Sequence, residues 1–337
     1  MSTSKHIDKI CIAAVSLTFV LTILFMCVGS HKIADASKSM QYESTLFDTS
    51  YVHKIDIMMD DWETFIENCE SEDYSACTVV IDGKKHSNIA IRAKGNTSLS
   101  SVRSMGSDDV KLKYIDDDPD SYSNIFDSAK TDISSADEKS LISALKNLSE
   151  YTDLENTLDT DEVLRYFVVH NFVVNGDSYT GSMIHNYYLH EKDGRLGMIP
   201  WDYNLAFGTF QGNSASSGVN DSIDEVLSDR PMQAWIFSDE QYTERYYELF
   251  AEFIKKWFTS DELSSMIEET SEMIRPYVEK DPTKFCTAEE FEKGVRALSE
   301  FVTLRAEAVS RQLRGDNTAV DTADLNLSDM GTMDHGH

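Results

Sequence analysis

Two aspartates and an asparagine lie close together in the middle of the chain. Asp177 follows an apolar run, Asn186 comes shortly after it, and Asp202 follows a second apolar run. Carboxylate and amide oxygens are ligands that Mg²⁺ accepts beside phosphate groups, and a carboxylate also accepts a proton from a hydroxyl group. These side chains therefore have the chemistry that phosphoryl transfer requires, in which positioning and charge neutralisation matter more than covalent chemistry.

A helix is predicted immediately before the first aspartate. Apolar residues recur at three- and four-residue spacing over residues 166–174, which is the period of a buried helix face. Asn175 and Gly176 follow, and this pair is typical of a helix that ends in a left-handed residue. Asp159 or Thr160 is expected to cap the other end of the helix. The pattern places Asp177 at the start of a loop.

A β-hairpin is predicted between the two aspartates. Residues 184–189 and 196–199 are short apolar runs, and residues 192–195 (Lys-Asp-Gly-Arg) between them are typical of a tight turn. Asp202 then comes just after the second strand. Protein kinases use the same order of parts: a catalytic Asp, an Asn a few residues on, and a metal-binding Asp after a hairpin. We therefore expect Asp177 and Asp202 to face a common cleft.

The residues around both aspartates also carry a family resemblance. N-x-D-S-Y-x-G-x-M-x-H-N-Y-Y-L at residues 175–189, followed by I-P-W-D-Y-N-L-A-F-G at 199–208, resembles the CotH kinase family, atypical kinases named after spore coat protein H. R-A-K-G-N-T-S at residues 92–98 is similar to the family's R-x-K-G-N-S-S. With Arg230-Pro231-Met232 downstream, the resemblance covers most of residues 50–315.

The resemblance implies an α+β fold of the atypical protein-kinase type. A small β-rich N-terminal lobe would precede a larger, mostly helical C-terminal lobe that contains the hairpin. Asp177 would be the catalytic residue that orients the acceptor hydroxyl and takes its proton. Asp202 would hold Mg²⁺ or Mn²⁺ on ATP, with Asn186 or Asn204 as a second metal contact.

The cation that pairs with the ATP phosphates is expected in the N-terminal lobe. A second hairpin, predicted over residues 77–82 and 87–94 with a turn at 83–85, leads to Arg92 and Lys94, with Lys113 behind them. The chain departs from the family just after this point. Residues 98–101 run almost directly into 107–114, where family members usually continue through a long block of further strands. The resemblance therefore implies a shortened N-terminal lobe.

The expected organisation also includes the two ends of the chain and four further helices. The 20 residues from Ile10 to Gly29 carry no charge, which is long enough for a membrane-spanning helix. We expect a signal anchor at 1–30, a stalk at 31–50, a kinase-like domain at 51–315 outside the cytoplasm, and a disordered acidic tail at 316–337. Amphipathic spacing predicts helices over residues 135–148, 239–257, 260–279 and 287–313.

The charge of the chain restricts its partners. The formal net charge is −29, which excludes the basic surface that nucleic-acid binding requires. It also disfavours docking on anionic lipid headgroups, so contact with a membrane is expected through the N-terminal helix only. A negative surface attracts cations, so we expect a basic, Ser/Lys-rich protein substrate on the cell surface or spore coat.

Two other functions stay open from the residues. The shortened N-terminal lobe is also compatible with a catalytically inactive pseudokinase that acts as a surface or coat scaffold. Such a protein is distinguished by testing whether ATP·Mg²⁺ raises its melting temperature. Asp177 and Asp202 could also form the acid/base pair of a hydrolase, as in glycosidases, and such activity would survive EDTA.

Overall fold

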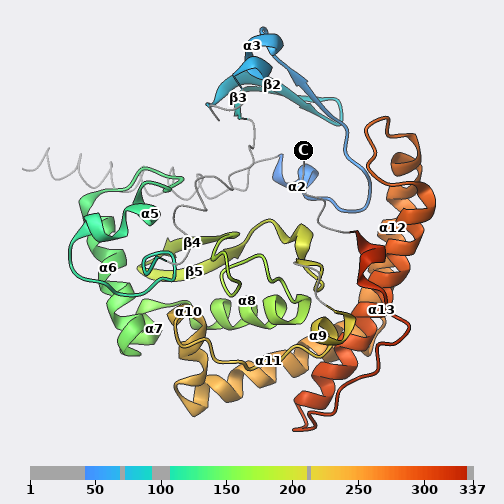
Figure 1. Cartoon of the computed structure of the whole chain (residues 1–337). Coiled ribbons are helices and arrows are strands. Elements are labelled where there is room, and N and C mark those ends of the chain that lie inside the picture. The colour runs from blue at the N-terminus through green and yellow to red at the C-terminus, as the bar shows by residue number, and fades with distance from the viewer. Residues whose placement is uncertain (1–41, 69–72, 93–106, 211–213, 332–337) are drawn as a thin grey trace, which may run out of the picture. The chain divides into compact units, whose positions relative to one another are not determined.

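The chain folds into two compact units, Met1–Ala93 and Lys94–His337. The computed structural model describes residues 42–68, 73–92, 107–210 and 214–331 (Figure 1). Both units combine helices with a small antiparallel sheet. The predicted α+β class is therefore confirmed.

The first unit is built on a three-stranded antiparallel sheet of order β1-β2-β3. Its strands are β1 (Ile55–Met58), β2 (Ser75–Ile81) and β3 (Lys84–Ile91), and its short helices are α2 (Glu43–Leu46) and α3 (Trp62–Glu67). The predicted second hairpin is present, but its turn lies one residue earlier, at Asp82 and Gly83. Both residues have positive φ, as the tightest hairpin turns require. Lys84 and Lys85 already belong to β3.

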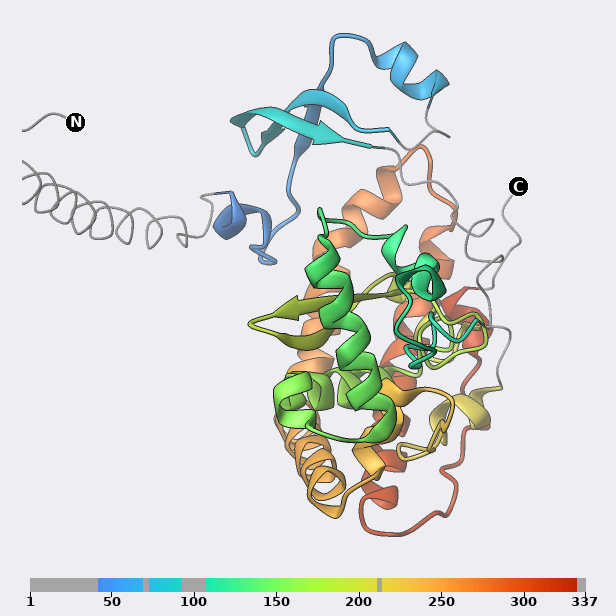
Figure 2. The same cartoon turned by 90° about the vertical axis from the view of Figure 1, so that its left-hand side faces the viewer.

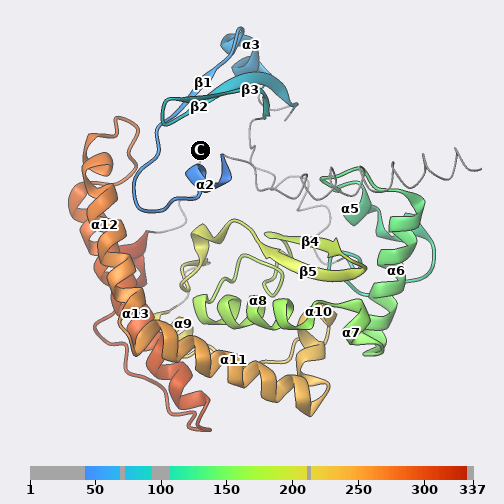
Figure 3. The same ribbon diagram turned by 180° about the vertical axis from the view of Figure 1, so that it is seen from behind.

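Helix α8 (Thr160–Val173) lies at the centre of the second unit. The hairpin of β4 (Tyr187–Lys192) and β5 (Arg195–Pro200) lies on one side of α8, and α11 (Glu240–Phe258) lies on the other (Figures 1 and 3). Covered from two sides, α8 buries Val163, Leu164, Tyr166, Phe167, Val168, His170 and Phe172.

The start of α8 is fixed by a cap and by the hairpin. The Asp159 side chain accepts a hydrogen bond from the Glu162 N–H, which satisfies one of the free donors at the helix start. The Asp159 N–H donates to Leu196 O on β5 at 2.9 Å, and the Leu196 side chain is buried in the core. The hairpin therefore has a fixed position on the helix.

The remaining helices surround this centre. Figure 2 is turned so that α6 faces the viewer. The three predicted C-terminal helices are observed as α11, α12 and α13, each with ends within two residues of the expected positions. The other elements of this unit are η2 (Pro119–Tyr122), α5 (Ser123–Phe126), α6 (Ser135–Glu150), α7 (Leu154–Thr157), η3 (Tyr203–Leu205), α9 (Ala215–Val219), α10 (Pro231–Ala234), η5 (Trp235–Phe237), α12 (Glu262–Lys280), α13 (Ala288–Gln312) and η6 (Leu327–Met330).

The prediction of a disordered C-terminal tail is wrong for residues 316–331. Helix η6 packs against α13, and the Val320, Leu325 and Leu327 side chains are buried. These three apolar side chains are enough to dock the segment, although it has no aromatic residue and no helical period. Residues 332–337 lie outside the described part of the chain.

The predicted signal anchor lies outside the described residues, as does most of the predicted stalk. No helix within residues 42–68, 73–92, 107–210 and 214–331 combines the length and the apolar character that crossing a bilayer requires. The described end of the stalk contains helix α2, so that part is not irregular.

Candidate functional site

The loop that carries Asp177 begins with a strained residue. Val174 has φ 49° and ends α8 in the left-handed conformation. The sequence pattern assigned this position to Asn175 or Gly176, and that assignment is wrong by one residue. A β-branched residue rarely adopts positive φ, and such strain persists only where the surroundings enforce it.

Asp177 is held on both of its carboxylate oxygens. His185 Nε2 contacts Asp177 Oδ1, and Asn186 Nδ2 donates to Asp177 Oδ2 at 3.0 Å and to Asp177 O at 2.9 Å. The Asp177 N–H donates to Asn175 Oδ1 at 3.2 Å. Only 11% of the Asp177 side chain is exposed. The contacts with His185 and Asn186 fix the direction of the carboxylate. Each carboxylate oxygen has two lone pairs, so the group keeps capacity to accept a further hydrogen bond.

The rest of the loop is held by a guanidinium group and by close backbone packing. Arg230 Nε donates to Tyr179 O at 3.0 Å, and Arg230 Nη2 donates to Gly181 O at 3.2 Å. A Cβ atom on Gly181 would lie 1.9 Å from Gly176 O, so the fold requires glycine at this position. The loop between α8 and β4 is therefore tightly closed on itself.

The segment that carries Asp202 attaches to the end of α8. Asp202 has φ 54° and leads into η3. The Phe207 N–H then donates to Val173 O at 2.5 Å, and the Gly208 N–H donates to Val174 O at 3.2 Å. These bonds satisfy carbonyl groups that a helix end leaves without partners. Both aspartate-bearing segments are thus fixed to the C-terminal end of α8.

Asp202 and Asn204 form a pair of oxygen-rich side chains. One terminal atom of the Asn204 amide lies 3.0 Å from Asp202 Oδ1 and 3.3 Å from Asp202 O. With its nitrogen turned toward Asp202, the amide donates hydrogen bonds. With its oxygen turned there, that oxygen lies 3.0 Å from Asp202 Oδ1 and 3.3 Å from Asp202 O, close to the spacing of neighbouring ligands around Mg²⁺ at metal–oxygen distances of about 2.1 Å. The first orientation satisfies the hydrogen bonds of the amide, so Asp202 and Asn204 would fit a hard divalent cation once the amide turns over.

A metal site built from protein carboxylates and histidines alone is not seen. In the described residues, no three or more His, Cys, Asp or Glu side chains come together in a way that could hold a metal ion. Mg²⁺ in phosphate-transfer sites usually keeps several waters and shares its shell with phosphate, so one or two protein ligands suffice.

Comparison with known proteins agrees with the family resemblance of the sequence motifs. The family model of the CotH kinase proteins matches residues 84–309. This chain belongs to the CotH kinase family. It is similar to inner spore coat protein H of Bacillus subtilis (strain 168), with 24% identity over 165 residues. That match covers 48% of this chain and 43% of the relative, so the chain spans less than half of the relative's length.

The basic residues expected to pair with ATP lie in different parts of the chain, Arg92 in the first unit and Lys113 in the second. The Arg92 guanidinium lies 5.4 Å from the centre of the Tyr74 ring, in the first unit. Lys94 lies outside the described residues. Lys113 Nζ is 2.9 Å from Asp108 Oδ1. Phosphate pairing by Arg92 and Lys94 stays a prediction.

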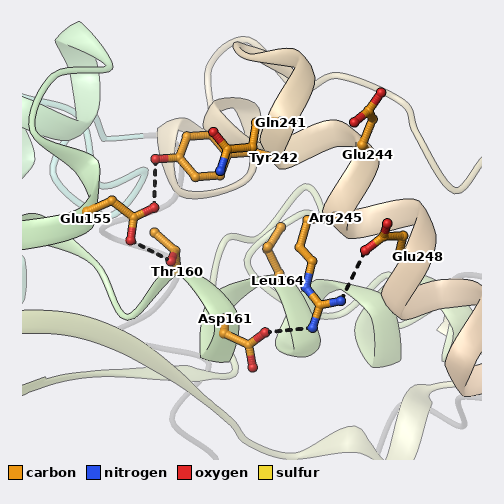
Figure 4. Close-up of a pocket in the computed structure, with 9 residues that line it drawn as sticks. All are labelled: Glu155, Thr160, Asp161, Leu164, Gln241, Tyr242, Glu244, Arg245 and Glu248. Carbon is orange, nitrogen blue, oxygen red and sulfur yellow. Dashed lines mark hydrogen bonds and ion pairs between the residues drawn. The ribbon is translucent and has the colours of Figure 1, made fainter.

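A cavity of about 340 Å³ lies away from the two aspartates, between the start of α8 and α11 (Figure 4). Its charged groups pair with one another: Arg245 reaches Asp161 at 3.3 Å and Glu248 at 3.2 Å, and Tyr242 donates to Glu155 at 2.9 Å. No predicted site residue lines it. A network of surface ion pairs lines this cavity, and we assign the cavity no role in the chemistry.

The sequence pattern did not identify three residues that position the site. His185 and Arg230 hold the Asp177 loop, and His170 lies beneath it. His185 and Arg230 lie within the family motifs, and His170 is a histidine inside the largely apolar run of α8, but the sequence assigned none of them a role. The partners of these side chains are distant in sequence, and no local spacing marks them.

Proposed function

We propose that this CotH family member is an atypical protein kinase that transfers the γ-phosphoryl group of ATP to a Ser or Thr hydroxyl. One observation carries the proposal: the carboxylate of Asp177 is buried and fixed by His185 and Asn186, on the same helix end that fixes the Asp202 segment. Phosphoryl transfer requires this kind of positioning above all.

Asp177 is assigned to the acceptor hydroxyl. Its two oxygens are directed by neighbouring donors, so the side chain does not have to be ordered when the acceptor arrives. It orients the hydroxyl and accepts its proton as the bond to phosphorus forms. General-base catalysis of this kind contributes about 10²- to 10⁴-fold to the rate.

Asp202 and Asn204 are assigned to a divalent cation, Mg²⁺ or Mn²⁺. When bound, that ion neutralises charge on the ATP phosphates. The Asp202 carboxylate and the Asn204 carbonyl would supply its protein ligands. Asn186 directs its amide nitrogen to Asp177 in this structure, and its Oδ1 is retained as the second candidate metal contact.

We further propose that the two units correspond to the two lobes of a kinase. The first unit is β-rich and the second is mostly helical. By the family resemblance, the sequence lacks the long block of strands expected after residue 98, so water would reach the nucleotide more easily. Electrostatic contacts weaken in contact with water. We therefore expect slow turnover and a weak affinity for ATP.

The acceptor is proposed to be a basic, Ser/Lys-rich protein outside the cytoplasm. The net charge of −29 would attract such a chain. The related Bacillus subtilis protein is named as an inner spore coat protein, which supports a location on the spore coat or cell surface. Residues 1–30 would anchor this protein in the membrane.

The test is incorporation of labelled phosphate from ATP, with Mn²⁺ or Mg²⁺, into a Lys/Ser-rich acceptor protein. Asp177→Asn should lower turnover by about 10²- to 10⁴-fold while leaving nucleotide binding intact. Asp202→Asn should abolish metal-dependent nucleotide binding. Asp132→Asn makes the same charge change at an exposed position, and it should behave like the wild type.

Each alternative function has its own outcome in this assay. Incorporation that persists in Asp202→Asn would refute the metal assignment. A wild-type protein that neither incorporates phosphate nor gains thermal stability from ATP·Mg²⁺ would support the scaffold instead. Hydrolysis of a glycan that survives EDTA would support the carboxylate-pair hydrolase.

A further inference from the structure

His170 lies at the point where the two aspartate-bearing segments meet. Its side chain projects from α8 and is buried, with 2% of the residue exposed. His170 Nε2 lies 2.7 Å from Thr180 Oγ1 and 3.3 Å from Ser178 Oγ, both in the loop after Asp177. On the other side of the ring, His170 Nδ1 lies 2.9 Å from the Tyr203 hydroxyl, next to Asp202.

Neighbouring aromatic rings also hold the imidazole ring of His170, in addition to the hydrogen bonds at its two nitrogen atoms. It stacks on the Tyr166 ring at 5.5 Å with an interplanar angle of 7°, and the Phe167 ring meets it edge-on at 6.0 Å. Burial lowers the pKa of His170 to about 4, and burial raises the pKa of Tyr203 to about 12. Both groups are therefore neutral at pH 7.

A neutral imidazole has one donor nitrogen and one acceptor nitrogen. Because a hydroxyl group can donate or accept, either tautomer of His170 joins Nδ1 to Tyr203 and Nε2 to Thr180 by hydrogen bonds. This arrangement gives each of the two segments one directed hydrogen bond to the same ring. A shift of either segment must break a bond inside the core, where an unpaired polar group costs more than it does at the surface.

We propose that His170 is a positioning residue that couples the loop of Asp177 to the segment of Asp202. The Thr180 bond fixes the loop that directs the Asp177 carboxylate. The Tyr203 bond fixes the turn that presents Asp202 and Asn204. Because the inference concerns the same site, its catalytic consequences rest on the proposed kinase function, whereas the coupling between the two segments does not.

Two substitutions separate the two bonds. Asn at position 170 places an amide near the former Nδ1 and keeps the bond to Tyr203, whereas Gln reaches farther and keeps the bond to Thr180. His170→Asn should lower turnover, and His170→Gln should raise the metal concentration that gives half-maximal activity. Outer-shell substitutions of this kind change activity or metal affinity by about 10- to 100-fold.

His170→Phe removes both bonds and retains an aromatic ring, so it should show both defects together. The matched control is His190→Gln, since His190 is a histidine of the same unit that pairs with Glu162 instead. It should change neither quantity. A purely structural His170 would lower stability without separating turnover from metal dependence in the Asn and Gln variants, and that result would overturn the proposal.

Amide hydrogen exchange tests the coupling without any assay of activity. In His170→Phe, exchange should speed up in residues 177–181 and in residues 203–208, while the β4–β5 turn stays unchanged. If His170→Phe does not fold, Thr180→Val and Tyr203→Phe remove one bond each and leave the buried ring in place. Each of these variants should then speed exchange most in the segment whose own bond is lost and measurably in the other segment, since the segments share one ring.

The outcomes distinguish the coupling from the proposed function. Faster exchange in both segments, with no kinase activity in the wild type, would uphold the coupling and refute the kinase. Faster exchange in one segment only, or in neither, would refute the coupling whatever the activity.

Discussion

Acidification should destabilise the second unit through His170. Burial favours the neutral imidazole and lowers the pKa of His170 from 6.5 to about 4. Between these two values the unfolded chain binds a proton that the folded chain does not, so the stability contribution is complete above pH 6.5 and is lost as the pH falls toward 4. A shift of about 2.5 units at about 1.4 kcal/mol per unit corresponds to about 3 kcal/mol.

The measurement compares the wild type with His170→Asn in urea at pH values from 7.5 to 4. Circular dichroism in the far ultraviolet follows the second unit, since it contains the long helices. The many carboxylates of the chain titrate in both proteins and cancel in the difference. The wild-type advantage in the free energy of unfolding should shrink by about 3 kcal/mol over this range. An advantage that stays constant with pH would show that the imidazole is not held neutral in the fold.

Two further substitutions and one truncation test the packing of the second unit. Gly181→Ala should speed amide exchange in residues 177–181 and lower the melting temperature, because its Cβ would lie 1.9 Å from Gly176 O. Arg305→Met should lower the free energy of unfolding by about 3–5 kcal/mol in urea, because it strips four main-chain carbonyls of a buried donor. Ending the chain at Gly315 should lower the free energy of unfolding by about 4 kcal/mol or more, because three buried apolar side chains are lost. Unchanged unfolding curves would contradict the last two.

The parts of the fold that were predicted from the sequence are those with local signals. The β4–β5 turn has Asp193 and Gly194 at its tip, and both have positive φ, as the residue types suggested. Helices α11, α12 and α13 carry apolar stripes over whole segments, so their ends were placed within two residues. Period and turn chemistry act over a few neighbouring residues, which makes them readable in a single sequence.

The parts that were missed depend on contacts between distant residues. Val174 ends α8 in a conformation that its side chain disfavours, and its carbonyl oxygen accepts a hydrogen bond from the distant Gly208 N–H. Residues 316–331 are ordered because α13 offers them an apolar surface. His170 joins residues 10 and 33 positions away. No local pattern records such tertiary contacts.

The segments that carry Asp177 and Asp202 are both fixed at the C-terminal end of α8. His170 and the last carbonyls of α8 fix both segments through contacts made entirely inside the second unit. Under the proposed function, absence of the strands expected after residue 98 would expose the nucleotide to water without removing a contact that positions Asp177 or Asp202. Under the proposed function, the defect should appear in the KM for ATP, while the requirement for both aspartates persists. A variant with the missing strands restored should then lower that KM and leave the effect of Asp177→Asn on turnover unchanged. If restoring the strands raised turnover at saturating ATP instead, those strands would help to position the reacting groups. The contacts at the end of α8 would then not be sufficient to position Asp177 and Asp202.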